Sequence, residues 1–357
     1  MLKTIVPMFV ILIVGFLTAK LDLIAHFVSR RISIQRIERR FCLPLFFFVT
    51  FVLVPSSANS QSDSLQKATV SGEDSSLIIL SDTQFASWFQ FWDENNARWV
   101  EAVIREAEHR PANLVLFLGD VTNHGSSVSE WRRFDTLTSV LFSKVPRRIA
   151  ALGNHDYFGS NRTALDNFFS RFPDLNNRQW SEHHWNQLGI VLLNSNFSEL
   201  SRDEQRDQQA WLEETLHKFD SDPEVVTVLV GFHHSPYSNS VVVGSNEEAQ
   251  QNFLPIIRKS RKVSVIISGH AHTYEHFFIE GRDYIVAGGC GPHHPVNVNV
   301  FTRDFDDLYH GNRIRPHHFC TIRRSGSSFI FEMHQLDEGN GTWTVGDSLK
   351  ITPLENP

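Results

Sequence analysis

The chain has 357 residues, of which 41% are hydrophobic and 20% are charged, and its net charge is −7 at pH 7. This composition is ordinary for a globular protein. The acidic balance and the lack of a basic stretch in the folded part argue against a nucleic-acid partner. The three cysteines, Cys42, Cys290 and Cys320, include no Cys-x-x-Cys pair, which excludes thiolate zinc sites and disulfide frameworks. A single Cys290–Cys320 disulfide in an exported protein stays open.

The first 58 residues indicate export. Two apolar runs, 4–19 and 41–54, flank a basic segment, and small polar residues follow the second run. A basic flank, an apolar core and a small polar exit make up a signal peptide, and basic flanks prefer the cytoplasmic side. We therefore expect residues 1–58 to be a signal peptide or membrane segments. The rest of the chain would then be periplasmic, secreted or membrane-anchored outside the cytoplasm, after a polar linker over residues 59–74.

From residue 75 onward, short apolar runs alternate with amphipathic stretches. The runs expected to be buried strands are 77–80, 114–118, 149–152, 190–193, 225–232 and 263–267, and a strand-rich end follows at 284–287, 319–322 and 329–333. Apolar residues at helical spacing predict helices over 95–110, 128–142 and 204–219. Strands that alternate with helices predict a layered α/β fold. We assign one domain to residues 75–340 and a C-terminal tail to residues 341–357.

Five polar segments follow the apolar runs directly. They are Asp82-Thr83-Gln84, Gly119-Asp120, Gly153-Asn154-His155-Asp156, Phe232-His233-His234 and Gly269-His270-Ala271-His272. Parallel strands bring their carboxyl ends to one edge of a sheet, where ligand groups converge. The donors are carboxylate, amide and imidazole groups without sulfur, which favours Mn, Fe, Zn or Co. They are too many for one ion and suit two ions about 3.5–4 Å apart, as used for phosphoryl hydrolysis.

The order of these five segments resembles the calcineurin-like metallophosphoesterase superfamily, which includes the purple acid phosphatases. The resemblance covers roughly residues 75–335, and the Gly-Asn-His-Asp segment followed by Gly-His-x-His is its most specific part. It implies a β-sandwich flanked by helices, an α+β layered arrangement with a dinuclear metal site at the strand ends. This expectation agrees with the alternation of strands and helices.

The resemblance also implies a role for each polar residue. The first ion would be held by Asp82, Gln84 and His272, the second by Asn154, His270 and His233, with His234 as the alternative to His233, and Asp120 would bridge both ions. A hydroxide between the ions would be the nucleophile. His155 resembles the histidine that contacts the phosphate and assists the leaving group. We expect Asp156 to orient His155 through a hydrogen bond.

Two departures from the family pattern stand out. Gln84 occupies a position where most relatives have a histidine ligand, and an amide oxygen is a weaker donor than imidazole. We therefore expect the first ion to bind less tightly. The residues after Asp120, Val121 to His124, lack the tyrosine that gives purple acid phosphatases their colour. The chain is thus predicted to be a colourless protein related to the purple acid phosphatases but without their tyrosine ligand.

The sequence therefore predicts a metal-dependent hydrolase that acts on a small phosphate ester. A phosphomonoester is the first choice of substrate and a phosphodiester is the alternative. A catalytically silent fold that binds metal or a partner is a third reading, motivated by Gln84. The presence of His155 and of every second-ion ligand argues against the silent fold. The oligomeric state stays open.

Overall fold

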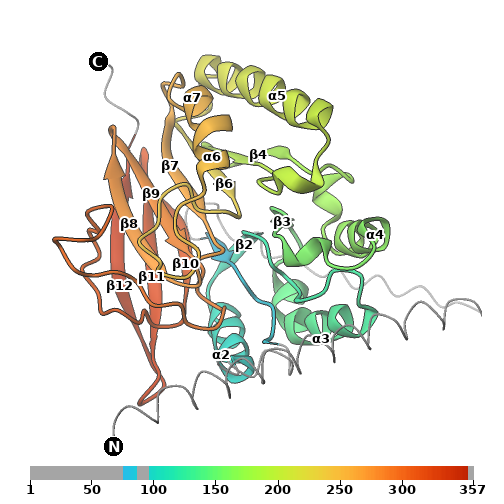
Figure 1. Ribbon diagram of the computed structural model, residues 1–357, viewed down its shortest axis with the longest axis vertical. Coiled ribbons are helices and arrows are strands. Elements are labelled where there is room, and N and C mark those ends of the chain that lie inside the picture. Colours follow the sequence, from blue (N-terminus) through green and yellow to red (C-terminus); the bar gives the residue numbers. More distant parts are fainter. Residues whose placement is uncertain (1–74, 87–95, 353–357) are drawn as a thin grey trace, which may run out of the picture. The chain divides into compact units, whose positions relative to one another are not determined.

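The computed structural model describes residues 75–86 and 96–352, whose strands form two six-stranded sheets (Figure 1). The first sheet has the order β12-β11-β10-β1-β2-β3 and the second has the order β4-β5-β6-β7-β9-β8. The first contains β1 (Ser76–Leu80), β2 (Ala112–Phe117), β3 (Arg148–Ala150), β10 (His318–Ser325), β11 (Ser328–Asp337) and β12 (Thr342–Ile351). The second contains β4 (Ser181–Trp185), β5 (Leu188–Leu192), β6 (Thr227–Phe232), β7 (Val263–Ser268), β8 (Tyr274–Ile279) and β9 (Arg282–Ala287).

Helices cover both sheets. They are α2 (Ala97–Ala107), α3 (Val128–Lys144), α4 (Asn161–Arg171), α5 (Arg202–Ser221), α6 (Glu247–Asn252) and α7 (Leu254–Ile257). Figure 1 shows α2 and α3 beside the first sheet and α5, α6 and α7 beside the second. The 20-residue helix α5 begins with a capping box in which Ser201 and Glu204 each accept a hydrogen bond from the other's backbone N–H, at 3.2 and 2.8 Å. Such a box satisfies donors that a helix start leaves open.

The apolar residues divide into two buried clusters that explain the layers. Val265 and Ile267 of β7 join the cluster that also contains residues of the first sheet. Ile266, which lies between them, joins the cluster under α5 and α7. Successive side chains of a strand point to opposite faces, so β7 is buried on both. The observed architecture confirms the predicted sandwich of two sheets flanked by helices.

The carboxyl ends of the parallel strands lie at one level. Strands β1, β2 and β3 pair in parallel, and Phe117 stands opposite both Leu80 and Ala150. Strands β5, β6, β7 and β9 are also parallel to one another. Backbone hydrogen bonds continue past the strands, with the N–H of Gly269 donating to the carbonyl of His233 at 2.9 Å. Because of this register, the polar segments that follow the strands lie together at one edge of the two sheets.

The predicted C-terminal tail is wrong for residues 342–351, which form β12 at the edge of the first sheet. Most side chains of β12 are half-buried or exposed, so the strand lacks the apolar run that revealed the central strands. The same reason explains why β4, with its polar sequence Ser-Glu-His-His-Trp, escaped the sequence analysis. Edge strands owe their place to backbone pairing more than to burial.

Several sequence predictions concern residues that the structure does not describe. The predicted export segments (1–58) and linker (59–74) lie outside the described residues. Within residues 75–86 and 96–352, no helix is long and apolar enough to cross a bilayer.

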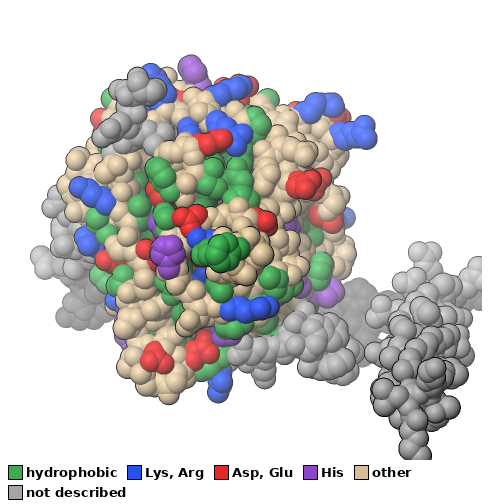
Figure 2. All heavy atoms as spheres, turned by 60° about the vertical axis from the view of Figure 1, so that its left-hand side comes forward, with side chains coloured by type: hydrophobic (Ala, Val, Ile, Leu, Met, Phe, Trp, Pro, Cys, Tyr) green, Lys and Arg blue, Asp and Glu red, His purple; other side chains and the backbone are tan. Residues whose placement is uncertain are grey.

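Cys290 and Cys320 are buried free thiols in the structure. On the face shown in Figure 2, Lys and Arg side chains are scattered among acidic and uncharged ones.

A partly buried ionic contact joins the edges of the two sheets. Asp347 of β12 accepts a hydrogen bond from the hydroxyl of Tyr274 at 2.8 Å and lies 2.8 Å from Nδ1 of His276 on β8. Asp283 lies 3.0 Å from Nε2 of the same imidazole. Burial alone would lower the pKa of His276, but the two carboxylates outweigh burial and raise the pKa to about 9. The charged imidazole therefore ties β12 to the second sheet.

This contact predicts a pH dependence of stability. Since the pKa of His276 rises from 6.5 to about 9 on folding, its contribution is complete below pH 6.5 and is lost as the pH rises through 9. We expect the free energy of unfolding to fall over this range and to fall less steeply in His276→Gln. Chemical unfolding at several pH values measures the slope, and an exposed control, His184→Gln, should keep the wild-type slope. Equal slopes in wild type and His276→Gln would contradict the assignment.

Candidate metal centre

Four of the predicted ligands share an unusual backbone conformation. Asp82, Asp120, His270 and His272 have φ angles of 57°, 49°, 67° and 46°. Non-glycine residues seldom adopt this left-handed conformation, and such residues cluster at functional sites. Each lies just beyond the carboxyl end of β1, β2 or β7, where the chain turns sharply to aim a side chain toward the others.

One group of donors forms around His272. Its Nε2 lies 3.4 Å from Oδ1 of Asp82, and Asp120 belongs to the same group, with the three ligand atoms within 4.8 Å of one another. The Gln84 amide is best satisfied with its nitrogen donating to the carbonyl oxygens of Asp82 and Asp120, at 2.9 and 2.8 Å. Its oxygen then lies 3.2 Å from Nε2 of His272. The structure thus brings together all four residues predicted around the first ion.

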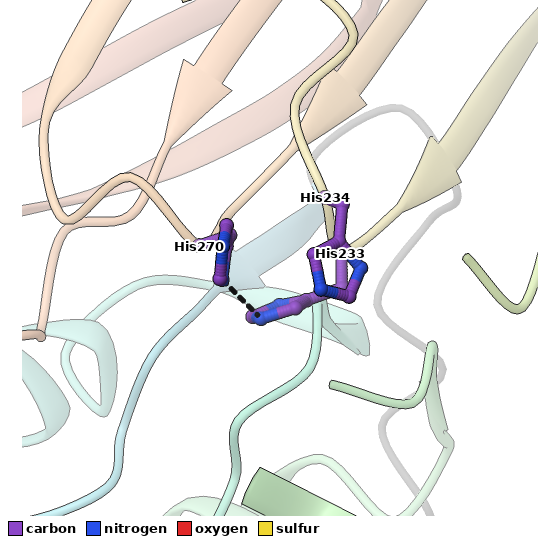
Figure 3. Close-up of side chains that lie close together, drawn as sticks. All are labelled: His233, His234 and His270. Atoms are coloured by element: carbon purple, nitrogen blue, oxygen red, sulfur yellow. Dashed lines mark hydrogen bonds between the residues drawn. The ribbon is translucent and has the colours of Figure 1, made fainter. Parts of the chain in front are cut away.

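A second group forms around His233. Its Nε2 lies 3.2 Å from Oδ1 of Asn154, 3.2 Å from Oδ2 of Asp120 and 3.2 Å from Nδ1 of His270. Figure 3 shows the rings of His233 and His270 converging, with a dashed line between their nitrogens. Asp120 belongs to both groups, so a single carboxylate links them. Such a shared carboxylate matches the bridging position that the resemblance implied.

The two neighbouring histidines differ in their surroundings. His234 lies close to His233 and His270, with its ring centroid 4.4 Å from that of His270 (Figure 3). Its Nδ1, however, lies 2.9 Å from the hydroxyl of Ser195. His233 alone of the two is in contact with Asn154 and Asp120. The geometry therefore favours His233 as the donor that faces the shared carboxylate.

Backbone carbonyl groups orient the imidazole rings. Nδ1 of His233 lies 2.9 Å from the carbonyl oxygen of Leu118, and Nδ1 of His272 lies 3.0 Å from that of Pro292. Each Nδ1 therefore donates its proton to a carbonyl, and Nε2 is the nitrogen that faces the carboxylates. Metal-binding histidines use this arrangement, in which a hydrogen bond at one nitrogen fixes the ring and the other nitrogen binds.

Two glycines make room for the carboxylates. A Cβ atom at Gly153 would lie 2.2 Å from both the backbone nitrogen and Oδ1 of Asp120. A Cβ atom at Gly269 would lie 2.1 Å from the Ser81 hydroxyl and 2.7 Å from Oδ2 of Asp82. No side chain could be accommodated at such distances without moving the carboxylates. The glycines of the sequence motifs are therefore required by close packing against the donors.

The electrostatics of the site favour a cation. Burial would raise the pKa of the Asp120 carboxyl, but the neighbouring His233 and His155 outweigh it and hold that pKa well below its usual range. Burial would lower the pKa of His233, but Asp120 and Asp82 outweigh it and raise the pKa to about 9. Two buried carboxylates thus create a strong negative potential. The same potential that holds a proton on His233 would hold a metal cation in its place.

His155 lies beside the shared carboxylate. Its backbone N–H donates to Oδ1 of Asp120 at 2.8 Å, and its Nδ1 lies 3.1 Å from the carbonyl oxygen of Asn123. Its ring lies against Phe158, with ring centroids 4.4 Å apart. The side chain is half-buried. An imidazole held at Nδ1 by a carbonyl has its Nε2 available for another group.

The expected contact between Asp156 and the His155 imidazole is wrong. The fully buried Asp156 carboxylate instead accepts hydrogen bonds from the backbone N–H groups of Gly153, Val121 and Thr122, at 2.9, 3.0 and 3.3 Å. It therefore joins the loop after β3 to the loop after β2. Burial and the nearby Asp120 raise the pKa of Asp156 to about 7. The motif aspartate is thus a positioning residue for the two loops.

Two residues support the site although no sequence motif indicated them. Ser81 donates its hydroxyl hydrogen to Oδ2 of Asp82 at 2.6 Å. Asn96 is buried, and its amide nitrogen donates to the carbonyls of Gln84 and Cys290 at 3.0 and 2.8 Å. Asn96 precedes α2, where asparagine is a common helix-capping residue. Asn96 lies at the start of the helix predicted over 95–110, so its position in the sequence gave no sign of this contact.

Two helix-flanked sheets with carboxylate, amide and imidazole donors at the strand ends are the architecture of a metallophosphoesterase. Residues 75–274 match the sequence profile of the calcineurin-like phosphoesterases, and the chain belongs to that family. It is 26% identical over 215 residues to purple acid phosphatase 22 of Arabidopsis thaliana, which covers 57% of this chain and 47% of the plant protein. The chain thus spans about half the length of this relative.

The chain is also similar to a cyanobacterial protein in sequence and to a solved plant structure in fold. Over 194 residues the chain is 29% identical to a Synechococcus protein named "Probable cyclic nucleotide phosphodiesterase", which covers 53% of this chain and 68% of that protein. The structure resembles the purple acid phosphatase PPD1 from yellow lupin (Lupinus luteus) seeds with a TM-score of 0.59 and 16% sequence identity. The match covers 79% of this chain and 54% of the lupin chain. This likeness shows a shared fold.

The role of Asp156 can be tested by its replacement. We expect Asp156→Asn to lower the free energy of unfolding by about 2 kcal/mol, because the amide cannot accept all three backbone hydrogen bonds. The control is Asp166→Asn, which changes an exposed carboxylate on α4. Urea unfolding of the full chain measures both. A loss in Asp156→Asn no larger than in the control would show that the carboxylate does not hold the loops.

Proposed function

We propose that the protein is a metal-dependent phosphohydrolase whose reaction uses two metal ions. The observation that carries this proposal is the pair of donor groups that share Asp120. One group contains Asp82 and His272 and the other contains Asn154 and His233, with 3.2–3.4 Å between neighbouring donor atoms. Two donor groups joined by a carboxylate are suited to two ions a few ångströms apart.

The donor set fits such ions. Oxygen and imidazole nitrogen donors suit Mn, Fe, Zn or Co, and there is no thiolate among them. The lysine and arginine ion pairs found in the described part of the chain do not involve the carboxylates of Asp82 or Asp120. When bound, the two ions would polarise the phosphate ester and lower the pKa of water. The charge of the buried carboxylates would then be compensated by the ions in place of the proton on His233.

His155 is suited to assist the leaving group. Its main chain is held against Asp120, and its Nδ1 is engaged by the carbonyl of Asn123. The ring is half-buried, so its Nε2 can meet a bound ester and donate a proton to the departing oxygen. Asp156 contributes by fixing the two loops that carry Asp120 and His155.

The proposed substrate is a small phosphomonoester, with a phosphodiester as the alternative. The plant relative is named as a phosphatase and the Synechococcus relative as a cyclic nucleotide phosphodiesterase, so the family relationship supports both classes. We further propose that the enzyme acts outside the cytoplasm, a proposal supported by the apolar and basic pattern of residues 1–58.

We expect the full chain, stripped of metal and resupplied with Mn, Fe, Zn or Co, to hydrolyse a chromogenic phosphomonoester faster than its diester analogue. His155→Gln should lower kcat at least ~100-fold while metal content is unchanged, since proton transfer contributes about 10²–10⁴ in rate. The matched control is His184→Gln, an exposed histidine on β4, which should keep full activity.

The outcomes of this assay separate the alternatives. A faster diester reaction would assign the phosphodiesterase activity instead. No turnover with any metal, while two ions still bind, would favour the catalytically silent fold.

Gln84 allows a second test of the paired centre. We expect Gln84→His to raise the affinity of the ion beside Asp82 and His272 by about tenfold, or ~1.4 kcal/mol. The reason is that imidazole is a stronger donor than an amide oxygen. Competition with a chelator of known affinity measures the change. Unchanged affinity would mean that the residue at this position does not contact the ion.

A further inference from the structure

A second cluster of potential ligands lies outside the paired centre. It consists of His293, His317 and Glu338, whose ligand atoms lie within 4.8 Å of one another. Oε1 of Glu338 lies 2.7 Å from Nδ1 of His317 and 3.1 Å from Nε2 of His293. The three residues come from the loop after β9, the residue before β10 and the turn between β11 and β12. The tertiary fold alone brings them together.

The distances suit a small tetrahedral ion. Zinc binds imidazole nitrogen and carboxylate oxygen at about 2.0–2.2 Å in tetrahedral geometry, which places its ligand atoms roughly 3.3 Å apart. The two observed separations, 2.7 and 3.1 Å, would have to open by about 0.6 Å at most. Two histidines and one glutamate are also a set that zinc uses when it keeps one position for water.

The cluster has a fixed side and an open side. The His317 side chain is fully buried, and its ring stacks on Trp99 with 5.7 Å between ring centroids. His293 and Glu338 border a cavity of about 700 Å³ that Tyr309 and Gln335 also line. A cavity of this volume holds many water molecules, so a fourth ligand has room on that side.

We propose that His293, His317 and Glu338 form a mononuclear metal site for a zinc-like ion, separate from the paired centre, with water as the fourth ligand on the cavity side. The site requires none of the donors around Asp120. The two sites are nevertheless neighbours. The residues on either side of His293 contact His272: the Pro292 carbonyl accepts the hydrogen bond from Nδ1 of His272, and the His294 ring stacks on the His272 ring with 4.4 Å between centroids. An ion at His293 would therefore secure the segment that orients His272.

The test is the zinc content of the untagged full chain in a background that disables the paired centre. In Asp82→Asn/Asp120→Asn we expect one zinc per chain to remain after dialysis, measured by elemental analysis. Adding Glu338→Gln to this background should weaken zinc binding at least ~10-fold and remove that zinc. The matched control is Asp337→Asn, the neighbouring carboxylate that borders the same cavity, which should retain it.

The outcomes separate this site from the paired centre. A difference in zinc content between wild type and the Asp82→Asn/Asp120→Asn background tests the paired centre alone. If that background binds no zinc, or if Glu338→Gln still holds it, the mononuclear site is overturned whatever the result for the paired centre. His293→Asn, which changes another member of the cluster, repeats the test should Glu338→Gln fail to fold, with circular dichroism as the check of folding.

Discussion

Two carboxylates, Asp82 and Asp120, are completely buried at the meeting point of the two sheets, and the surrounding structure compensates their charge. Removing a carboxylate from water costs several kcal/mol unless partners replace the solvent. Here the partners are imidazole rings and backbone N–H groups, including those of His270 and His155. The loops after the strands are shaped to deliver these partners. A site that concentrates buried negative charge in this way is suited to cations, and its imidazoles are held in the orientation that cations require.

The strain in this arrangement is local and is balanced by a large core. Left-handed backbone at four predicted ligands is sustained because the strands that precede them are buried on both faces. Asp156 adds a hydrogen-bonded connection between two of the loops. The same logic extends to the far edge of the molecule, where Asp347 and His276 connect the outermost strands of the two sheets. Ionic contacts, buried at the centre and partly buried at one edge, thus fix both parts of the sandwich.

The cluster of His293, His317 and Glu338 extends this picture. Its members lie on loops and turns around the strand-rich C-terminal part, next to the segment that orients His272. The C-terminal strands therefore complete the first sheet and also position two members of this cluster. His317 and Glu338 lie close to His293, and the neighbours of His293, Pro292 and His294, contact the His272 ring. The last strands of the chain are thus connected to the predicted catalytic site.

The amino-acid sequence by itself determined the family, the layered fold and the polar segments that gather at the strand ends. Buried parallel strands appear as continuous apolar runs, and the polar segments that follow them mark the edge where ligands gather. Tertiary structure decided which partner each of these side chains contacts, because short-range sequence patterns carry no information on such contacts. It showed His233 facing Asn154 and Asp120 while His234 meets Ser195, and it showed the Asp156 carboxylate bonded to backbone groups of two loops.

Tertiary structure also decided the end of the chain and the second cluster. Most side chains of β12 are half-buried or exposed, and its sequence contains no apolar run. Only its pairing with β11 therefore reveals it as a strand. His317 and Glu338 are 21 residues apart in the sequence and meet because β10 and β11 form a hairpin, whereas His293 reaches them from the loop after β9. Contacts between distant segments depend on strand register and loop path, and these are set by packing of the whole fold.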